Sequence, residues 1–379
     1  MIIFLESNTS GFGEHILRYC KQQSTDLIFV TDNIDKYNDL SLLRDEIKII
    51  SSDELNYAVS KGRYVDCIYA STSDSGIEKA AELSERQEYL KFIKTCRDKL
   101  KLQKLLYGSN FFSRVLTHAS LSELDDKKKY VIKPNKGTGS MDISMGIGNS
   151  LKNRFIEIAD AKKDFIIEEY IEGIEYSAEY MIHEGKIFLM AIFRKYNHSH
   201  NMQQEIMHEL IEYNERIDNE LSAEIEKILK CTNAYTINTF LHIEFKLKED
   251  SIHVIEINPR LCGSLLPFAL KYMYNGLDFD RLFVEVITNK VNPNQLAQIN
   301  DYKNKSRLDK IIICSTTSPE RSLEMIDYFK DNSIVIEMHR VNENFISNCS
   351  DFRGRHSTFM VHGNLNLSVM KKILDVADE

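Results

Sequence analysis

The first 95 residues alternate short apolar runs with amphipathic stretches. Ile2–Leu5 and Leu27–Val30 are apolar and short enough to be buried strands, and Gly13–Lys21 between them has the spacing of a helix. Further predicted elements are strands at Ile47–Ile50 and Cys67–Tyr69 and one long helix at Ile77–Phe92. This alternation of strand and helix predicts a parallel sheet covered by helices.

From Tyr130 onwards the pattern changes to strands joined by tight turns. Tyr130 opens a strand that leads into a glycine-rich turn, Phe165–Ile171 is a further strand, and Tyr176–Arg194 predicts a hairpin. Thr239–Lys246 and Ile252–Ile257 predict two antiparallel strands joined by a short polar turn. This part of the chain therefore predicts an antiparallel sheet.

Helical patterns and a last α/β unit complete the chain. Arg97–Leu106 predicts a basic, leucine-rich helix, and Glu205–Lys230 predicts a long one, whereas the segment from Asn292 to Arg307 is polar. The last unit consists of a strand at Lys310–Cys314, a helix at Glu324–Lys330, a strand at Ile334–His339 and a helix from Leu367. The whole predicts a mixed α/β (α+β) fold with several domains, as its 379 residues require.

Composition excludes several classes of protein. The net charge is −9 and there is no sustained basic patch, which argues against a nucleic-acid binder. No apolar stretch approaches the ~18 residues needed to span a bilayer, and Met1–Leu5 meets Glu6 at once, unlike a signal peptide. The seven cysteines form no CxxC pair, so we expect neither a disulfide framework nor a zinc site, and a cytoplasmic protein.

A glycine-containing turn, Ser10–Gly13, follows the first predicted strand. A dinucleotide-binding fingerprint requires a third glycine, and Ile16 occupies that place. The turn therefore predicts either a tight connection or a loop on the substrate side.

The strongest chemical signal is a set of oxygen donors on the two predicted antiparallel strands. Glu244 and Glu256 lie twelve residues apart, at positions that pairing would place opposite each other, and Glu256 and Asn258 share one face. Mg²⁺ prefers hard oxygen ligands completed by waters and substrate phosphates. The alternative is solvated acids at a hairpin, but Glu256 and Asn258 lie in an otherwise apolar strand.

A second signal is a strand lysine followed by glycines. Lys133 precedes Gly137, Gly139 and Ser140, and glycines let backbone N–H groups approach an anion closely. The Walker pattern GxxxxGK[ST] is absent, so a P-loop is excluded. A hairpin with a polar turn is the structural alternative.

Together these segments resemble the ATP-grasp superfamily, which includes D-alanine–D-alanine ligase, biotin carboxylase and the L-amino-acid ligases. The superfamily pattern is an acidic residue on one strand and Glu-x-Asn-x-Arg on the next, matched here by Glu244, Glu256, Asn258 and Arg260. The resemblance implies that the glutamates and Asn258 hold Mg²⁺, with Mn²⁺ as an alternative, and that Arg260 meets the acyl phosphate or the reacting carboxylate. It further implies that Lys133 contacts the ATP phosphates beneath a lid containing Gly137, Gly139 and Ser140.

The same resemblance assigns an adenosine site to Ile166–Tyr176. Glu168 would accept from the adenine amino group, Glu169 and Ile171 would offer main-chain contacts, and Glu175 would hold the ribose. Lys99 would reach the ATP phosphates, although Lys101 and Lys104 lie close by. The cation that faces the γ-phosphate would be Arg194, with the adjacent Lys195 left open.

The implied architecture is an ATP-grasp fold in three parts: an N-terminal parallel α/β domain (1–95), an ATP-grasp domain (96–295, with a lid at about 123–168) and a small C-terminal α/β subdomain (296–379). The implied activity is ATP-dependent carboxylate–amine ligation through an acyl phosphate. Its partners would be small molecules, amino acids among them, with no nucleic acid or membrane, and a homodimer stays open. The alternatives are a bicarbonate-activating carboxylase and a non-catalytic nucleotide-binding protein on the same fold.

Overall fold

The structure is a computed structural model of the full chain. It describes residues 1–8, 10–37, 46–106, 115–116, 124–137, 143–160, 164–199, 201–274, 276–299, 310–342, 345–347 and 354–377. Gly139 and Ser140, both predicted for the lid, lie outside the described residues.

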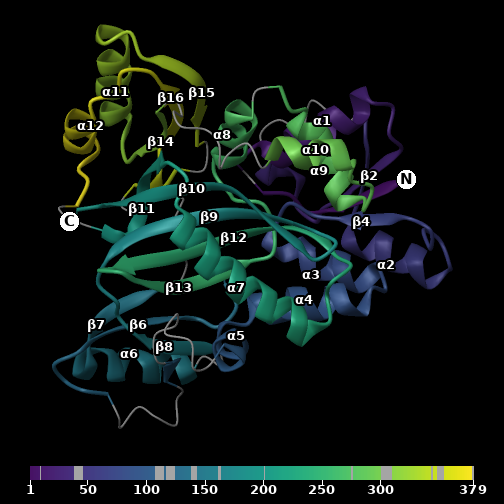
Figure 1. Ribbon diagram of the computed structural model, residues 1–379, viewed down its shortest axis with the longest axis horizontal. Coiled ribbons are helices and arrows are strands. Elements are labelled where there is room, and N and C mark those ends of the chain that lie inside the picture. Colours follow the sequence, from purple (N-terminus) through teal and green to yellow (C-terminus); the bar gives the residue numbers. More distant parts are fainter. Residues whose placement is uncertain are drawn as a thin grey trace.

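The N-terminal part is a four-stranded parallel sheet in the order β3-β2-β1-β4. Its strands are β1 (Ile2–Leu5), β2 (Leu27–Val30), β3 (Lys48–Ile50) and β4 (Ile68–Ala70), and its helices are α1 (Phe12–Gln22), η1 (Ile34–Lys36), α2 (Ser52–Ser60), α3 (Asp74–Leu83) and α4 (Gln87–Arg97). The predicted parallel α/β arrangement is confirmed. It lies on the right of Figure 1, beside the central sheet.

The long helix predicted at Ile77–Phe92 is wrong, because the chain breaks there into α3 and α4. Glu85, in the connection, has a φ of 55°, which lies outside the helical region. A new amphipathic pattern starts at Gln87, and both helices bury their apolar faces, so periodicity alone did not reveal the turn.

A second, four-stranded sheet has the order β5-β8-β6-β7 and is covered by a helix (Figure 1). Its elements are β5 (Val115–Leu116), β6 (Lys129–Pro134), β7 (Ser144–Ile147), α6 (Gly148–Asp160) and β8 (Phe165–Glu169), and α5 (Lys99–Leu105) precedes it. Tyr130, Ile132 and Ile167 form its small apolar core. We call the four strands and α6 the lid layer, after the lid predicted at about 123–168, whose role as a lid stays a prediction.

The central sheet has eight strands in the order β13-β12-β9-β10-β11-β14-β16-β15, and its paired strands are antiparallel. The first five in chain order are β9 (Ile174–His183), β10 (Lys186–His198), β11 (Asn201–Leu210), β12 (Asn238–Lys248) and β13 (Ser251–Asn258). The helix α7 (Glu215–Thr232) lies between β11 and β12 in the chain. The predicted antiparallel sheet is confirmed.

The start of the helix predicted at Glu205–Lys230 is wrong, because Glu205 belongs to β11. Ile206, Met207 and Leu210 are spaced as on a helix, yet β11 is an interior strand that pairs with β10 on one edge and with β14 on the other. Ile206 and Met207, on its opposite faces, are both buried. The helix begins after Asn214, whose side chain accepts a hydrogen bond from the Ile217 amide at 3.1 Å.

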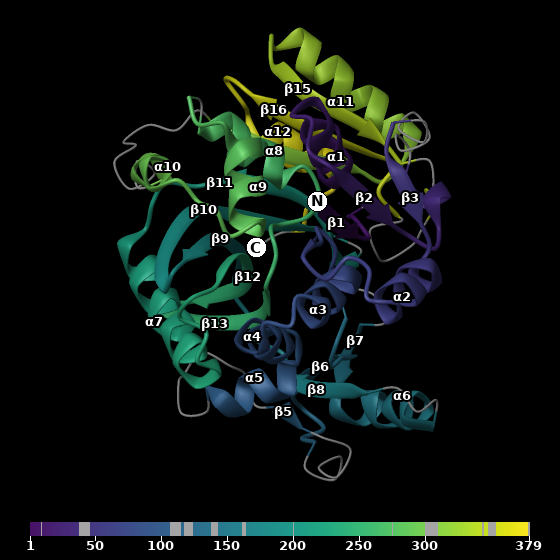
Figure 2. The same cartoon turned by 90° about the vertical axis from the view of Figure 1, so that its right-hand side faces the viewer.

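The C-terminal segment continues the central sheet through the β11–β14 pairing. Its elements are β14 (Ile311–Thr316), α11 (Pro319–Asp331), β15 (Val335–Val341), β16 (Ser357–His362) and α12 (Leu367–Leu374), and they follow α8 (Leu266–Met273), α9 (Phe279–Ile287) and α10 (Pro293–Ile299). The predicted α/β unit is present, but β16 was not anticipated. Figure 2 shows α11 and α12 on these last strands, at the end of the molecule away from the lid layer.

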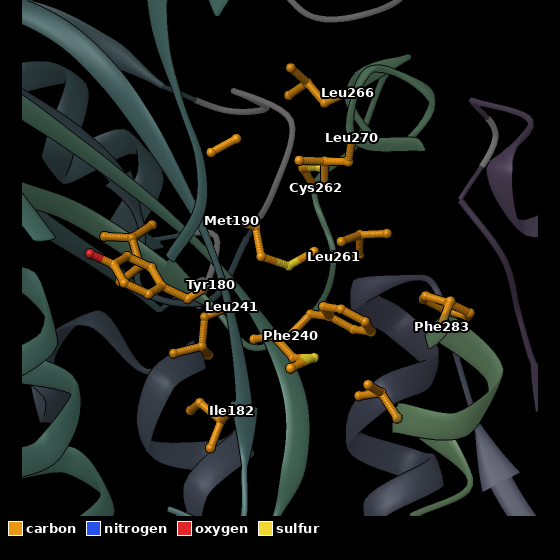
Figure 3. Packing of buried hydrophobic residues seen from close by; sticks show 14 of the residues in the cluster. Tyr180, Ile182, Met190, Phe240, Leu241, Leu261, Cys262, Leu266, Leu270 and Phe283 are labelled. Carbon is orange, nitrogen blue, oxygen red and sulfur yellow. The ribbon is translucent and has the colours of Figure 1, made fainter. Parts of the chain in front are cut away.

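One large apolar core joins the N-terminal part to the central sheet. Tyr180, Met190, Leu241 and Leu270, shown in Figure 3, belong to the same buried cluster as Phe4 of β1. Among the described residues, no helix is both long and apolar enough to cross a membrane.

Candidate active site

The predicted metal ligands lie together on one face of the central sheet. In the β12–β13 register Glu244 is directly opposite Glu256 and His242 is opposite Asn258, so the four side chains share a face. The Asn258 Nδ2 atom donates to Glu256 Oε1 at 2.7 Å, which orients the amide oxygen away from that carboxylate. The predicted grouping of Glu244, Glu256 and Asn258 is therefore found in the structure.

A buried lysine lies beside Glu244. Lys195 Nζ is 2.8 Å from Glu175 Oε1 and 2.9 Å from Glu244 Oε2, and it also pairs with Glu205. Burial alone would lower the pKa of Lys195, but the three carboxylates raise it well above its usual value. Lys195 therefore stays protonated and balances part of a dense negative cluster.

Arg194 points away from this cluster because neighbouring strand residues face opposite sides of the sheet. Its guanidinium lies 5.0 Å from the centre of the Tyr196 ring. Geometry thus favours Lys195, which the sequence left open, as the cation next to the metal ligands. The catalytic role predicted for Arg194 stays a prediction.

Glu205 was missed because the sequence pattern placed it in a helix. It is one of three carboxylates, with Glu175 and Glu244, that offer oxygens within 4.8 Å of one another. On its other side Glu205 Oε2 lies 3.7 Å from the Arg355 guanidinium, which comes from the C-terminal segment. The alternation of side chains along β10 and β11, on either side of the turn near Ser199, is the sequence signal that could have identified Glu205.

A buried histidine connects Glu244 to the sheet beneath. His242 Nε2 is 3.0 Å from Glu244 Oε1, and its Nδ1 is 2.7 Å from Glu179 Oε1. Burial alone would lower the pKa of His242, but Glu179 and Glu244 raise it to about 10. Burial would raise the pKa of Glu244, yet Lys195 and the His242 imidazolium hold it well below the usual value. Glu244 is therefore ionised and has a fixed orientation, as its predicted role of metal ligand requires.

Two lysines reach the site from the lid side. Lys99 at the start of α5 places Nζ 3.2 Å from Glu256 Oε2 and donates to the Gly137 carbonyl at 3.4 Å. Lys133 on β6 places Nζ 2.6 Å from Glu168 Oε2 and donates to the Ile255 carbonyl at 3.2 Å. Both lysines are buried, so their charges lie between the lid layer and the central sheet.

The predicted adenosine residues lie along the edge of the lid layer. Glu168 is engaged by Lys133, Glu169 lies 3.0 Å from Lys128, and the Ile171 carbonyl accepts from Lys246 at 3.1 Å. Glu175 faces Lys195 on the sheet. Glu168, assigned to adenine, thus pairs with Lys133, and Glu175, assigned to ribose, pairs with Lys195.

Arg260 is held by the N-terminal part of the molecule. Its Nε donates to Asp74 Oδ2 at 2.6 Å, and its Nη1 donates to the Leu261 carbonyl at 2.9 Å. Asp74 begins α3, so a helix of the parallel sheet positions the arginine that follows the metal ligands in sequence. Arg260 is almost fully covered, with 13% of its side chain exposed.

The N-terminal glycine turn holds an arginine of its own chain. Arg340 of β15 lies 3.7 Å from Glu14 in α1, and a Cβ added to Gly11 would lie 1.2 Å from its Nη1. The cation fills the space where the turn could have admitted a ligand phosphate. This arrangement agrees with the absence of a dinucleotide fingerprint.

The donor set fits Mg²⁺. Glu244, Glu256 and Asn258 supply hard oxygen atoms on one face, and the lysines at 2.9 and 3.2 Å from the two carboxylates balance charge that a divalent ion would otherwise balance. Two carboxylates at directly paired positions without nearby cations would repel each other. Carboxylate and amide oxygens that leave metal positions for phosphate oxygens, next to buried lysines, suit a metal-bound triphosphate.

Comparison with known proteins agrees with this geometry. Residues 96–264 match the ATP-grasp domain family. No curated protein matches the chain in sequence.

Solved structures share the whole fold. The L-amino acid ligase from Bacillus licheniformis has a TM-score of 0.70 at 14% identity, covering 100% of this chain and 99% of that one. N5-carboxyaminoimidazole synthetase from Staphylococcus aureus, complexed with ADP, has a TM-score of 0.66 at 11% identity, covering 98% and 95%. Biotin carboxylase from Campylobacter jejuni, in a β,γ-ATP complex, has 0.57 at 13%, covering 98% and 89%. The chain therefore contains a segment, residues 96–264, that matches the ATP-grasp domain family, within a fold that it shares with these enzymes along its whole length.

Proposed function

We propose that the protein is an ATP-dependent carboxylate–amine ligase that forms an amide or peptide bond through an acyl phosphate. The observation that carries the proposal is the pairing of Glu244 with Glu256, opposite each other on two strands, with Lys99 3.2 Å from Glu256. Oxygen ligands and buried cations at one place are what a Mg-ATP phosphoryl transfer needs.

In the first step, a carboxylate oxygen of the substrate attacks the γ-phosphorus of ATP. A new O–P bond forms, the bond to the bridging oxygen of ADP breaks, and negative charge builds on the phosphoryl oxygens. Lys99 and Lys133 are placed to neutralise that charge from the lid side, and Lys195 from the sheet. Glu244, Glu256 and Asn258 would hold Mg²⁺, which would supply further neutralisation of the phosphoryl charge.

In the second step, a neutral amine attacks the acyl carbon and a tetrahedral intermediate forms. The C–O bond to phosphate then breaks, the amine proton passes to solvent, and the products are the amide, ADP and phosphate. Arg260 supports this step because its guanidinium is fixed by Asp74 and can hold the substrate carboxylate and later the oxyanion. The step uses no covalent protein nucleophile.

Bicarbonate activation is the second candidate, because N5-carboxyaminoimidazole synthetase and biotin carboxylase share the fold. It uses the same phosphoryl transfer with the bicarbonate anion in place of a substituted carboxylate. The two reactions differ in which acid is required for ADP release.

The experiment is an ADP-release screen of acid and amine pairs with Mg-ATP, with the products identified by mass spectrometry. A carboxylate labelled with ¹⁸O should transfer one label to the released phosphate, because the acyl–oxygen bond breaks after phosphorylation. Glu256→Gln serves as the inactive control. ADP release that needs only bicarbonate would establish the second candidate, and ADP release without label transfer would exclude the acyl phosphate.

A further inference from the structure

We propose that the interdomain cavity behind Arg260 receives the uncharged, mainly apolar tail of the acid substrate, whose carboxylate is held at Arg260. The inference rests on the proposed ligase function and names the class of acid. It concerns the seam between β4 and α3 of the N-terminal part and β12 and α9 of the central part.

The cavity has a volume of about 250 Å³. At roughly 30 Å³ for each water-sized group, it could hold on the order of eight such groups. Its walls come from both sides of the seam and include Ala70, Ile77, Ala80, Phe240 and Phe283. In Figure 3 Phe240, Leu261 and Phe283 lie near one another at this seam, and the Phe240 and Phe283 rings stack 5.4 Å apart.

The charge of the lining selects against a cation. Arg260 and Arg86 are the charged residues among those that the structure places around the cavity, and no carboxylate lines it. Arg86 lies 3.6 Å from Glu88 and donates to the Thr236 carbonyl at 3.3 Å, so it is already engaged at the protein surface. Arg260 is therefore the charged end of the cavity, and the remaining lining is uncharged, with hydroxyl and amide groups such as those of Ser71 and Asn238 beside the apolar side chains.

Arg260 also connects the cavity to the reacting centre. Its Nε and Nη1 atoms are occupied by Asp74 and the Leu261 carbonyl, whereas none of the described residues engages Nη2. Arg260 follows the end of β13 by two residues, so it lies next to the strand that carries the predicted metal ligands Glu256 and Asn258. A carboxylate at Arg260 would thus face the phosphoryl group, while its tail extends along β4.

The test is a series of monocarboxylic acids with one accepted amine, measured by ADP release. The series runs from acetate through branched, aliphatic and aromatic acids, with dicarboxylates and amino-alkyl acids as charged-tail members. We expect kcat/KM for tails of four to eight carbons to exceed that for acetate or the charged tails at least tenfold. Bicarbonate has no tail to bury and should be poorer still.

Cavity variants separate binding in this space from general effects. Ala80→Leu fills the cavity and should lower kcat/KM for the larger acids at least tenfold, with less than a twofold effect on acetate and on ATP affinity. Ile287→Ala enlarges the cavity and should move the preference towards longer acids, which keeps the proposal testable if Ala80→Leu folds poorly. Ala58→Leu is the matched control, because Ala58 is buried in α2 away from the cavity.

The outcomes distinguish the cavity from the activity. ADP release with no preference for apolar tails, or no change in Ala80→Leu, would overturn the cavity proposal and leave the ligase proposal standing. If no acid and amine pair releases ADP, the proposed function fails, and calorimetry of the same acids with a non-hydrolysable ATP analogue still tests the cavity. Apolar acids that bind the wild type but not Ala80→Leu would support it, and absence of binding would overturn it.

Discussion

Two glycine-containing segments each follow a buried strand, one after β1 in the N-terminal part and one after β6 in the lid layer. At Ser10–Gly13 the space left by Gly11 is taken by Arg340 from β15, whose partner is Glu14. At the other turn the Gly137 carbonyl accepts from Lys99, which lies 3.2 Å from Glu256, and Lys133 lies 2.6 Å from Glu168. The first turn joins two parts of the fold, and the second lies beside the lysines that we expect to face a nucleotide.

The difference shows that glycine permits close approach without deciding what approaches. At the first turn the approaching group is an arginine of the same chain from more than 300 residues further along the sequence, as the numbering of Gly11 and Arg340 shows. At the second turn one cation, Lys133, is close in sequence and the other, Lys99, comes from α5, and their partners are Glu168 and Glu256. Removing a charged side chain should therefore lower stability at the first turn and lower activity at the second.

The largest effect is expected for Glu256→Gln, on the reactive side. Loss of this charge removes a metal ligand and the partner of Lys99, and it should reduce ADP release by at least about a thousandfold, equivalent to several kcal/mol. Circular dichroism and thermal unfolding should show an intact fold. Turnover near the wild-type rate would remove Glu256 from the metal site.

Lys133→Ala and Arg260→Ala should each lose about a hundredfold in activity, at different steps. Lys133 lies beside the nucleotide side of the lid, so its loss should weaken ATP binding measured by calorimetry and slow phosphoryl transfer. Arg260 faces the acid, so its loss should leave ATP affinity within a few fold and raise KM for the acid. Equal loss of ATP affinity in the two variants would contradict this division.

Arg340→Ala should act on stability rather than on chemistry. The Glu14 side chain is 2% exposed, and removing its cation leaves a buried carboxylate, so we expect the free energy of unfolding to fall by about 2 kcal/mol. ADP release per folded molecule should change less than threefold. The surface pair of Arg321 with Glu324 supplies a control, since Arg321→Ala should change stability by less than about 0.5 kcal/mol. An inactive but fully stable Arg340→Ala would place this turn in the reactive site.

The smallest effect concerns pH and the histidine beneath Glu244. The pKa of His242 is raised to about 10, with Glu179 and Glu244 outweighing burial, whereas a histidine in an unfolded chain has about 6.5. Its contribution to stability is complete below pH 6.5 and is lost as pH rises towards 10. Between pH 7 and pH 9.5, the free energy of unfolding measured with urea should fall less for His242→Asn than for the wild type. The partly exposed His253, changed to Asn, is the control, and equal losses in all three proteins would contradict the assignment.

The local pattern of apolar and polar residues was sufficient to predict the strands whose partners are close in sequence. The paired strands around Glu244 and Glu256 could be predicted because a tight hairpin fixes its own register, and that register grouped the predicted metal ligands. The first parallel strands followed from short apolar runs. In each case the neighbours that determine the structure are close in sequence.

Pattern failed where distant partners determine the conformation. β11 looks helical in sequence, and its strand conformation comes from β14, about a hundred residues later. Glu205 was missed for the same reason. The Asp74–Arg260 pair and the Arg355 contact with Glu205 also join distant segments, and no spacing rule connects them.

The β11–β14 ladder has a consequence for engineering. Without the C-terminal segment, β11 would be an open edge, and Met207 and Tyr196 would lose the apolar cluster that they share with Phe329 and Phe359. Open apolar edges recruit other chains into aggregates. A chain truncated before β14 should therefore aggregate, and its activity could not be compared with that of the full chain. Chimaeras that exchange this segment between related proteins need a donor strand that preserves the pairing of Met207 with Cys314.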